Sequence, residues 1–380
     1  MDATMTPPPV RLDGRVVVAA DVERVAARLR FDVAARSAHA EAGVEFVVEG
    51  GDGCPALDLR QNVASLRLDG VQLPGDAFSP MDLGGGEGAE MRVLDRVLPV
   101  GSRHRLDLSY QLDTPAAREA QPIGWDGGVR FDFSMSDLYP GRYLEMWLPA
   151  GLCQDRFRLR LDIEVLNASV GHTIITNGVH AQLGADRWEI AYPAQFTSLS
   201  PMLVIAPSPQ IDVRQRLVAL AGRTQPVTLV TAGHHDAEAD LVACEADIAA
   251  WLAYNAERYR PWVHGDRFAA VIWGPRRGME YDSGTTASVS ALEHEVLHSW
   301  FGRGVKPSRA SDGWIDEAWT GWATSSRRSE EGRFAEVELG LDEPPVVLCP
   351  PHPWSRHTPV ESYREGTRLF AGLAHLLGGA

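Results

Sequence analysis

Apolar and polar positions alternate through much of the first half of the chain. The clearest case is Phe157–Val165, in which every second side chain is apolar, as in a strand with one buried face. Glycine-rich segments such as Gly84–Gly88 separate the runs. This pattern predicts an N-terminal antiparallel β-sandwich or saddle domain. The other expected strands are Val16–Ala20, Glu45–Val48, Arg92–Val100, Arg105–Gln111 and Thr173–Asn177.

The pattern changes after the Pro-Ser-Pro segment at 207–209, which we take as the boundary between domains 1–208 and 209–380. The second part mixes helical periodicity with short buried runs, so the whole chain is expected to be an α+β protein with a mixed α/β second domain. The expected elements are a strand at Val227–Val230, a helix from about Asp236 to Arg260, a strand at Ala269–Trp273 and a helix from about Glu361 to Leu377.

Composition excludes several classes of function. Of the 380 residues, 44% are hydrophobic and 23% are charged, as in an ordinary soluble globular protein. The net charge of −15, without any basic run, argues against a nucleic-acid partner. No apolar run is long enough to span a membrane. The segment Met1–Arg15 has prolines and acidic residues where a signal peptide needs a basic start and an apolar core, so we expect a cytoplasmic protein.

The cysteines suggest neither a disulfide framework nor a zinc ribbon. They are far apart in the sequence and form no Cys-x-x-Cys pair, so buried or incidental thiols are expected. The four positions are Cys54, Cys153, Cys244 and Cys349.

The segment His294-Glu295-Val296-Leu297-His298 carries recognisable chemistry. On a helix, the imidazoles of His294 and His298 lie one turn apart on the same face and can reach one tetrahedral ion. Glu295 then projects beside the ion, where it can act as general base toward a zinc-activated water. Glu317, in a second expected helix that begins near Trp314, can supply the third ligand. These residues predict one Zn²⁺ with an open fourth position, and therefore a hydrolase.

A chance match is the competing explanation for this motif. Roughly a few per cent of chains with this histidine content would contain a His-Glu-x-x-His by accident. The apolar side formed by Leu292, Val296 and Leu297 makes a helix plausible here, and Asp312 is a suitable cap ahead of the second helix. We therefore favour the metal site.

The residues around the motif resemble the aminopeptidase N type of gluzincin metallopeptidases, a family that includes leukotriene-hydrolase enzymes. The stretch from His294 to Gly302 is similar to the family's zinc helix, including its Trp-Phe-Gly tail, and 312–318 is similar to its Asp-Leu-Trp-Leu-Asn-Glu-Gly segment. Gly278-Met279-Glu280-Tyr281 resembles the Gly-x-Met-Glu-Asn signature, with Tyr281 in place of Asn. Tyr363-Arg364-Glu365-Gly366 resembles the Tyr-Glu-Lys-Gly element.

The resemblance implies a thermolysin-like catalytic domain and roles for further residues. Glu280 would hold the free α-amino group of a peptide substrate, while Gly278 and Met279 line the cleft. Tyr363 would donate a hydrogen bond to the tetrahedral oxyanion. The family's large C-terminal helical domain has no counterpart here, which implies a more open cleft for longer or bulkier substrates.

Alternatives stay open for each of these roles. A glutamate at a strand end, as at Glu280, is often a solvated or salt-bridged side chain, and Tyr363 could serve packing. The favoured function is an aminopeptidase acting on peptides or peptidyl conjugates. The alternatives are a specialised biosynthetic hydrolase of a carrier- or peptide-linked intermediate and a non-catalytic peptide-binding or scaffold module.

Overall fold

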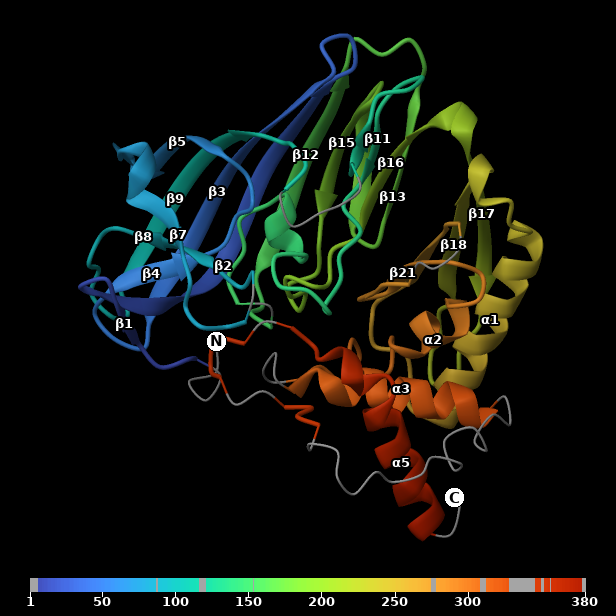
Figure 1. Cartoon of the computed structure of the whole chain (residues 1–380). Helices are drawn as coiled ribbons and strands as arrows, with labels where there is room; N and C mark the ends of the chain where they lie inside the picture. Colours follow the sequence, from blue (N-terminus) through green and yellow to red (C-terminus); the bar gives the residue numbers. More distant parts are fainter. Residues whose placement is uncertain are drawn as a thin grey trace. The chain divides into compact units, whose positions relative to one another are not determined.

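The computed structural model describes residues 6–86, 88–115, 121–152, 154–274, 278–307, 312–327, 346–349, 352–355 and 357–377. The chain divides into two compact units, Met1–Asp212 and Val213–Ala380. The first is built almost entirely of strands, and the second combines a mixed sheet with helices (Figure 1). The chain therefore has the α+β fold that the sequence pattern predicts.

A twelve-stranded sheet forms most of the first unit, with the order β14-β15-β12-β2-β3-β9-β5-β6 along its main path. Its longest strands, β2 and β3, pair antiparallel from Ala19↔Glu49 to Asp32↔Ser37. Two pairings, β12 with β2 and β4 with β2, are parallel. The path strands are β14 (Val179–Gly184), β15 (Arg187–Ala191), β12 (Arg158–Leu166), β2 (Arg15–Asp32), β3 (Ser37–Glu49), β9 (Arg103–Gln111), β5 (Val63–Leu68) and β6 (Val71–Gln72).

The remaining strands of the first unit are short. β1 (Val10–Leu12), β4 (Cys54–Leu57), β7 (Phe78–Met81) and β8 (Met91–Leu94) join the large sheet beside its main path. A separate four-stranded sheet has the order β10-β11-β16-β13, with β10 (Ile123–Gly124), β11 (Arg130–Asp132), β16 (Leu203–Pro207) and β13 (His172–Thr176).

Aromatic side chains connect the two sheets of this unit. The ring of Phe31 on β2 meets that of Phe131 on β11 edge-on, with centroids 5.3 Å apart, and Trp147 lies 5.4 Å from Phe131. All three side chains are buried. Leu161 on β12 is buried while Arg160 beside it is exposed, as the alternating pattern predicts.

Three predicted strands have wrong bounds, and the one expected at Glu45–Val48 is only the last part of β3. The strand expected at Arg92–Val100 ends at Leu94, because the chain turns there and the amide of Asp95 bonds to the carbonyl of Ala77. The strand expected at Val16–Ala20 continues to Asp32, because β2 pairs with β3 and β12 along its second half.

The second unit is centred on a five-stranded sheet with the order β17-β18-β19-β21-β20. β18, β19 and β21 run parallel, and β20 is antiparallel to β21. The strands are β17 (Ile211–Val218), β18 (Val227–His234), β19 (Arg267–Ile272), β20 (Glu280–Tyr281) and β21 (Gly284–Ala287). Two of the predicted strands thus appear as β18 and β19.

Helix α1 (Leu241–Arg258) packs on this sheet through Ile248 and Leu252, which lie one turn apart and are buried. It begins later than expected because Glu238 takes a left-handed conformation and Asp240 caps the helix through the amides of residues 242 and 243. Helix α2 (Leu292–Leu297) contributes Val296 to the same core.

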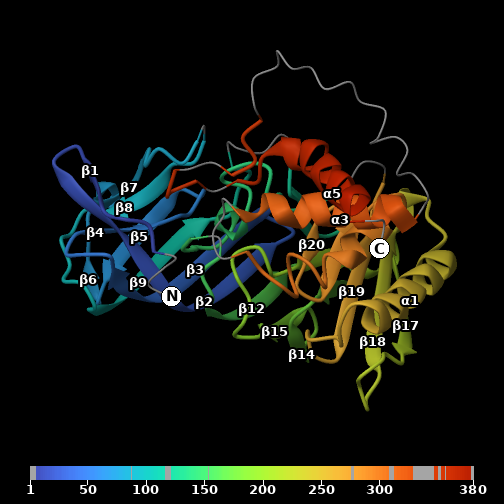
Figure 2. The same cartoon turned by 90° about the horizontal axis from the view of Figure 1, so that it is seen from below.

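Helices α3 (Trp314–Arg327) and α5 (Glu365–Leu376) pack against each other, which Figure 2 shows from below. Their contact is aromatic: the ring of Phe370 lies 5.4 Å from that of Trp319, which in turn lies 4.9 Å from Trp322. A short 3-10 helix at Val360–Ser362 leads into α5. Within the described residues, no helix is both long and apolar enough to cross a bilayer.

Three of the cysteines, Cys54, Cys244 and Cys349, are free thiols. Cys153 lies outside the described residues.

Candidate metal centre

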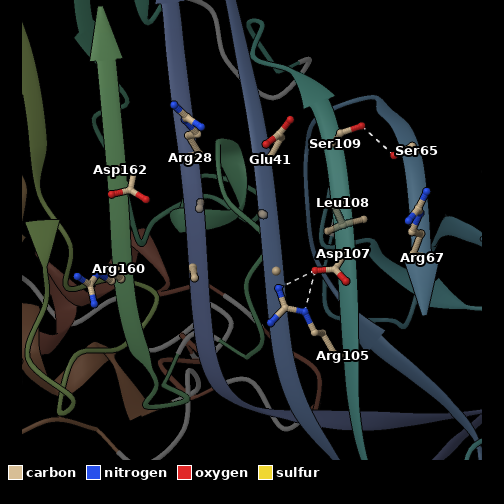
Figure 3. Close-up of a pocket in the computed structure, with 14 residues that line it drawn as sticks. Arg28, Glu41, Ser65, Arg67, Arg105, Asp107, Leu108, Ser109, Arg160 and Asp162 are labelled. Carbon is tan, nitrogen blue, oxygen red and sulfur yellow. Dashed lines mark hydrogen bonds and ion pairs between the residues drawn. The ribbon is translucent and has the colours of Figure 1, made fainter. Parts of the chain in front are cut away.

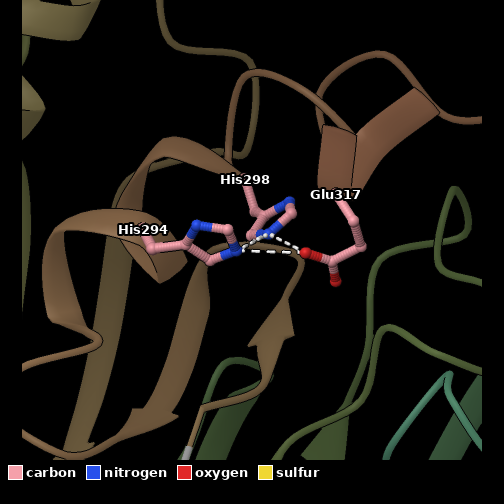
Figure 4. Close-up of side chains that lie close together, drawn as sticks. All are labelled: His294, His298 and Glu317. Atoms are coloured by element: carbon pink, nitrogen blue, oxygen red, sulfur yellow. Dashed lines mark hydrogen bonds and ion pairs between the residues drawn. The ribbon is translucent and has the colours of Figure 1, made fainter. Parts of the chain in front are cut away.

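Three side chains from two helical segments converge on one point (Figure 4). His294 lies in the last turn of α2, His298 is the residue at its C-terminal cap, and Glu317 lies in the first turn of α3. His294 Nε2 is 3.0 Å from both His298 Nε2 and Glu317 Oε2. His298 Nε2 is 3.4 Å from the same carboxylate oxygen. The three atoms therefore form a compact triangle.

This triangle fits a zinc ion. Zn–N and Zn–O bonds of about 2.0–2.2 Å at tetrahedral angles place neighbouring ligand atoms roughly 3.3–3.5 Å apart. The observed separations of 3.0 to 3.4 Å approach that range without rearrangement. Two neutral imidazoles and one carboxylate are also a donor set typical of catalytic zinc, and they leave one position for water or substrate.

The charges in this cluster are strongly coupled. Burial opposes protonation of His298, but the carboxylates of Asp316, Glu280 and Glu317 raise its pKa well above the usual value. Burial raises the pKa of Glu317, yet His298 and His294 outweigh it and hold that pKa below the usual value. The site thus concentrates negative charge around two imidazoles, as a cation site requires.

Asp316 is a residue of this site that the sequence did not identify. Its carboxylate accepts a 2.5 Å hydrogen bond from His298 Nδ1, which leaves His298 Nε2 for the cluster. Burial raises the pKa of Asp316 to about 6, against the opposing effect of His298. The only signal in the sequence was a second acid directly before Glu317. Gly302 makes room for it, because a Cβ at Gly302 would overlap the Asp316 carboxylate.

Glu295 follows His294 directly on α2, and its side chain is buried. A Cβ at Gly278 would overlap Glu295 Oε1, so the structure brings the predicted base against the backbone of the segment predicted to line the cleft. Met279, next to it, is buried and exchanges two 3.0 Å backbone hydrogen bonds with Thr286.

Tyr363 reaches the same site from the end of the 3-10 helix that precedes α5. Its ring stacks on that of His294 with centroids 6.2 Å apart and an interplanar angle of 25°. The side chain is 38% exposed, so it is not a core residue. Tyr363 therefore lies beside the candidate ligand His294.

Glu280 carries an ion pair that the sequence analysis allowed for but did not assign. Its carboxylate lies 2.6 Å from the guanidinium of Arg303, and the two side chains are 3% and 2% exposed. Glu280 is also close to the metal centre, because a carboxylate oxygen of Glu280 lies within 4.8 Å of atoms of His298 and Asp316.

A second ion pair repeats this arrangement nearby. The ammonium of Lys306, the only lysine of the chain, lies 2.8 Å from the Asp282 carboxylate. The imidazole of His264 is 3.6 Å from the same carboxylate and 2.6 Å from the carbonyl of Ser299.

A separate hollow of about 570 Å³ lies on the large sheet of the first unit (Figure 3). Two of its arginines pair with neighbours on the sheet: Arg105 with Asp107 at 2.8 Å and Arg160 with Glu189 at 2.5 Å. Its floor contains Ala42 and Gly43. This is the arrangement of a solvated sheet face, and among the described residues it holds none of the candidate metal groups.

Comparison with known proteins supports the fold. No protein-family model and no curated protein matches the sequence. An M1 zinc metallopeptidase from Deinococcus radiodurans superposes with a TM-score of 0.64 at 17% identity, covering 95% of this chain and 84% of that chain. Leukotriene A4 hydrolase from Saccharomyces cerevisiae gives 0.60 at 13% identity, covering 95% of this chain and 60% of that chain.

The chain therefore has the fold of the M1 zinc metallopeptidases, as the motifs predicted, and carries a candidate His-His-Glu metal cluster within it. A mutant of the Deinococcus enzyme has been solved with a Tyr-Ser-Ala substrate bound, and it matches this chain with a TM-score of 0.66 at 16% identity.

Proposed function

We propose that this protein is a zinc-dependent hydrolase that cleaves an amide bond in a peptide or peptidyl conjugate. The convergence of His294, His298 and Glu317 carries the proposal, and Glu295 lies between the two histidines on the same helical segment. The fold supports it, because the solved structures that share this fold include M1 zinc metallopeptidases, one of them with a bound Tyr-Ser-Ala substrate.

The side chains divide the work as follows. Zinc at this site would supply Lewis acidity toward the scissile carbonyl and the attacking water. Glu295 takes the proton of the water and delivers it to the leaving amine. The hydroxyl of Tyr363 donates a hydrogen bond to the developing oxyanion. Asp316 holds His298 in the orientation that directs Nε2 to the cluster.

Aminopeptidase action is the finer proposal within this class. It is supported by a solved M1 zinc metallopeptidase mutant with bound L-tryptophan and by the Deinococcus radiodurans mutant with bound Tyr-Ser-Ala. It also requires that Glu280 be available to the ammonium group of a substrate, with Gly278 and Met279 lining the cleft.

A second candidate is hydrolysis of a carrier- or peptide-linked intermediate. The ion pair of Glu280 with Arg303 favours it, because the carboxylate expected to bind an ammonium already has a cation.

A substrate panel tests the general proposal. Purified protein would be stripped with a chelator, reloaded with zinc, and assayed on aminoacyl and N-blocked peptide substrates. Zinc-dependent cleavage of either class is expected, together with loss of about one bound zinc per chain in His294→Ala and retention in His375→Ala, an exposed control on α5. Protein that binds no zinc, or cleaves equally well without it, would contradict the proposal.

A further inference from the structure

We propose that Arg303 determines substrate specificity: its guanidinium takes the place of a substrate ammonium on Glu280, so the site accepts substrates whose amino end is uncharged. Such substrates are N-acylated or carrier-linked peptides. The inference rests on the proposed hydrolase function, names its substrate class, and favours the second candidate over aminopeptidase action.

Glu280 is held in place by its strand. Glu280 pairs with Thr285 across β20 and β21, and the preceding residue Met279 exchanges two 3.0 Å backbone hydrogen bonds with Thr286. The hydroxyl of Thr285 donates a further bond to the Met279 carbonyl at 3.0 Å. These bonds fix the backbone from which the Glu280 side chain extends toward the candidate metal centre.

The turn that follows α2 holds Arg303 in place. Its amide bonds to the carbonyl of His298 at 3.0 Å, and the amide of Val305 bonds to the carbonyl of Trp300 at 3.1 Å. The amide of Gly302 closes the turn on the Val305 carbonyl at 2.8 Å. This turn is hydrogen-bonded to the C-terminal end of α2. The segment that carries the two candidate histidine ligands therefore also positions the guanidinium of Arg303 against Glu280.

The guanidinium of Arg303 neutralises the negative charge of Glu280, and binding of a substrate ammonium depends on that charge. At 2.6 Å, with both side chains nearly inaccessible, the guanidinium donates a charge-assisted hydrogen bond to Glu280. An ammonium brought to the same carboxylate would meet a like charge with little solvent between them, which is unfavourable. An uncharged acyl group meets no such repulsion.

The neighbouring ion pair extends this argument. Glu280 and Asp282 are alternate residues of one segment, and the turn residues Arg303 and Lys306 supply one cation to each. Both acids of this segment thus have a cation from within the chain. The Lys306–Asp282 pair can be compared with the Arg303–Glu280 pair, because its cation comes from the same part of the chain and it does not involve Glu280.

The test compares Arg303→Gln with Arg303→Lys, which retains the positive charge, and with Arg258→Gln, an exposed control on α1. The readout is the ratio of kcat/KM for leucine-aminomethylcoumarin to that for its N-acetyl derivative, with folding checked by circular dichroism. We expect wild type, Arg303→Lys and Arg258→Gln to favour the acetylated substrate. Arg303→Gln should shift the ratio by about 10–100-fold toward the free amine, and a further Glu280→Gln change should remove that gain.

The outcomes separate this inference from the proposed function. A wild-type preference for the free amine that Arg303→Gln leaves unchanged would overturn the specificity role while zinc-dependent hydrolysis stands. If zinc-loaded protein hydrolyses neither substrate, the proposed function fails, and calorimetry with leucinamide and N-acetylleucinamide still decides the inference. Tighter leucinamide binding by Arg303→Gln would support it, and unchanged binding would overturn it.

Discussion

His298 Nδ1 donates a 2.5 Å hydrogen bond to the carboxylate of Asp316, the residue directly before the candidate ligand Glu317. One turn of α3 therefore supplies both a candidate ligand and the group that orients another. A carboxylate behind a metal-binding imidazole fixes its tautomer and increases its basicity.

Replacing Asp316 with Asn should weaken zinc binding by about 10–100-fold, because the negative partner of the imidazole is lost while the shape is kept. Competition with a chromophoric chelator measures this affinity. Glu361→Gln, an exposed change, serves as the control. Unchanged affinity in the Asp316 variant would show that the hydrogen bond does not tune the metal site.

Replacing Glu295 with Gln should leave zinc content intact and lower kcat by about 10²–10⁴-fold, since the amide cannot take a proton from water. Zinc content and steady-state kinetics measure the two effects. Glu293→Gln on the same helix should have a much smaller effect on kcat. Comparable losses in both variants would argue against Glu295 as the base.

Replacing Tyr363 with Phe should lower kcat by roughly 10²–10³-fold with little change in KM, because the hydroxyl acts on charge that develops in the transition state. The stacking on His294 should survive, since the ring is retained. Tyr254→Phe on α1 is the matched control. A Tyr363 variant with full kcat would assign this ring to packing alone.

Replacing Asp155 with Asn should make stability less dependent on pH. Burial, together with the nearby Asp21, raises the pKa of Asp155 well above its usual value. The folded state therefore binds more protons than the unfolded state above about pH 4, and stability falls as pH rises through that window.

Asparagine removes this loss and can still accept the 2.7 Å hydrogen bond from the Val22 amide. Urea unfolding should show the stability of the variant rising relative to wild type as pH increases above about pH 4. A constant difference across this range would contradict the shifted pKa.

Lys306 should react slowly with amine-acylating reagents in the folded protein. It is the only lysine, its side chain is 8% exposed, and it pairs with Asp282. Mass spectrometry should find acylation of Lys306 at least about 100-fold slower in buffer than in urea. Equal acylation rates in buffer and in urea would mean that the turn after α2 opens readily.

The sequence predicted the parts of the site that depend on short-range geometry. His294 and His298 follow helical spacing, and a second helix beginning near Trp314, with Asp312 ahead of it as a cap, was expected to carry Glu317. The ion pair of Arg303 with Glu280 was not predictable, because it depends on how the turn at 302–305 folds back on the zinc helix. The length of β2 was missed for a similar reason, since pairing with β3 and β12 rather than local pattern determines where it ends.

Gly302 has a φ of 91°, and the space above its Cα is filled by the Asp316 carboxylate. These two positions cannot drift independently in evolution. A homologue with a side chain at position 302 would have to forgo the acid at position 316 and, with it, the support of an imidazole. Covariation of this glycine with this aspartate would therefore mark the chains that inherited the same orientation of the second histidine.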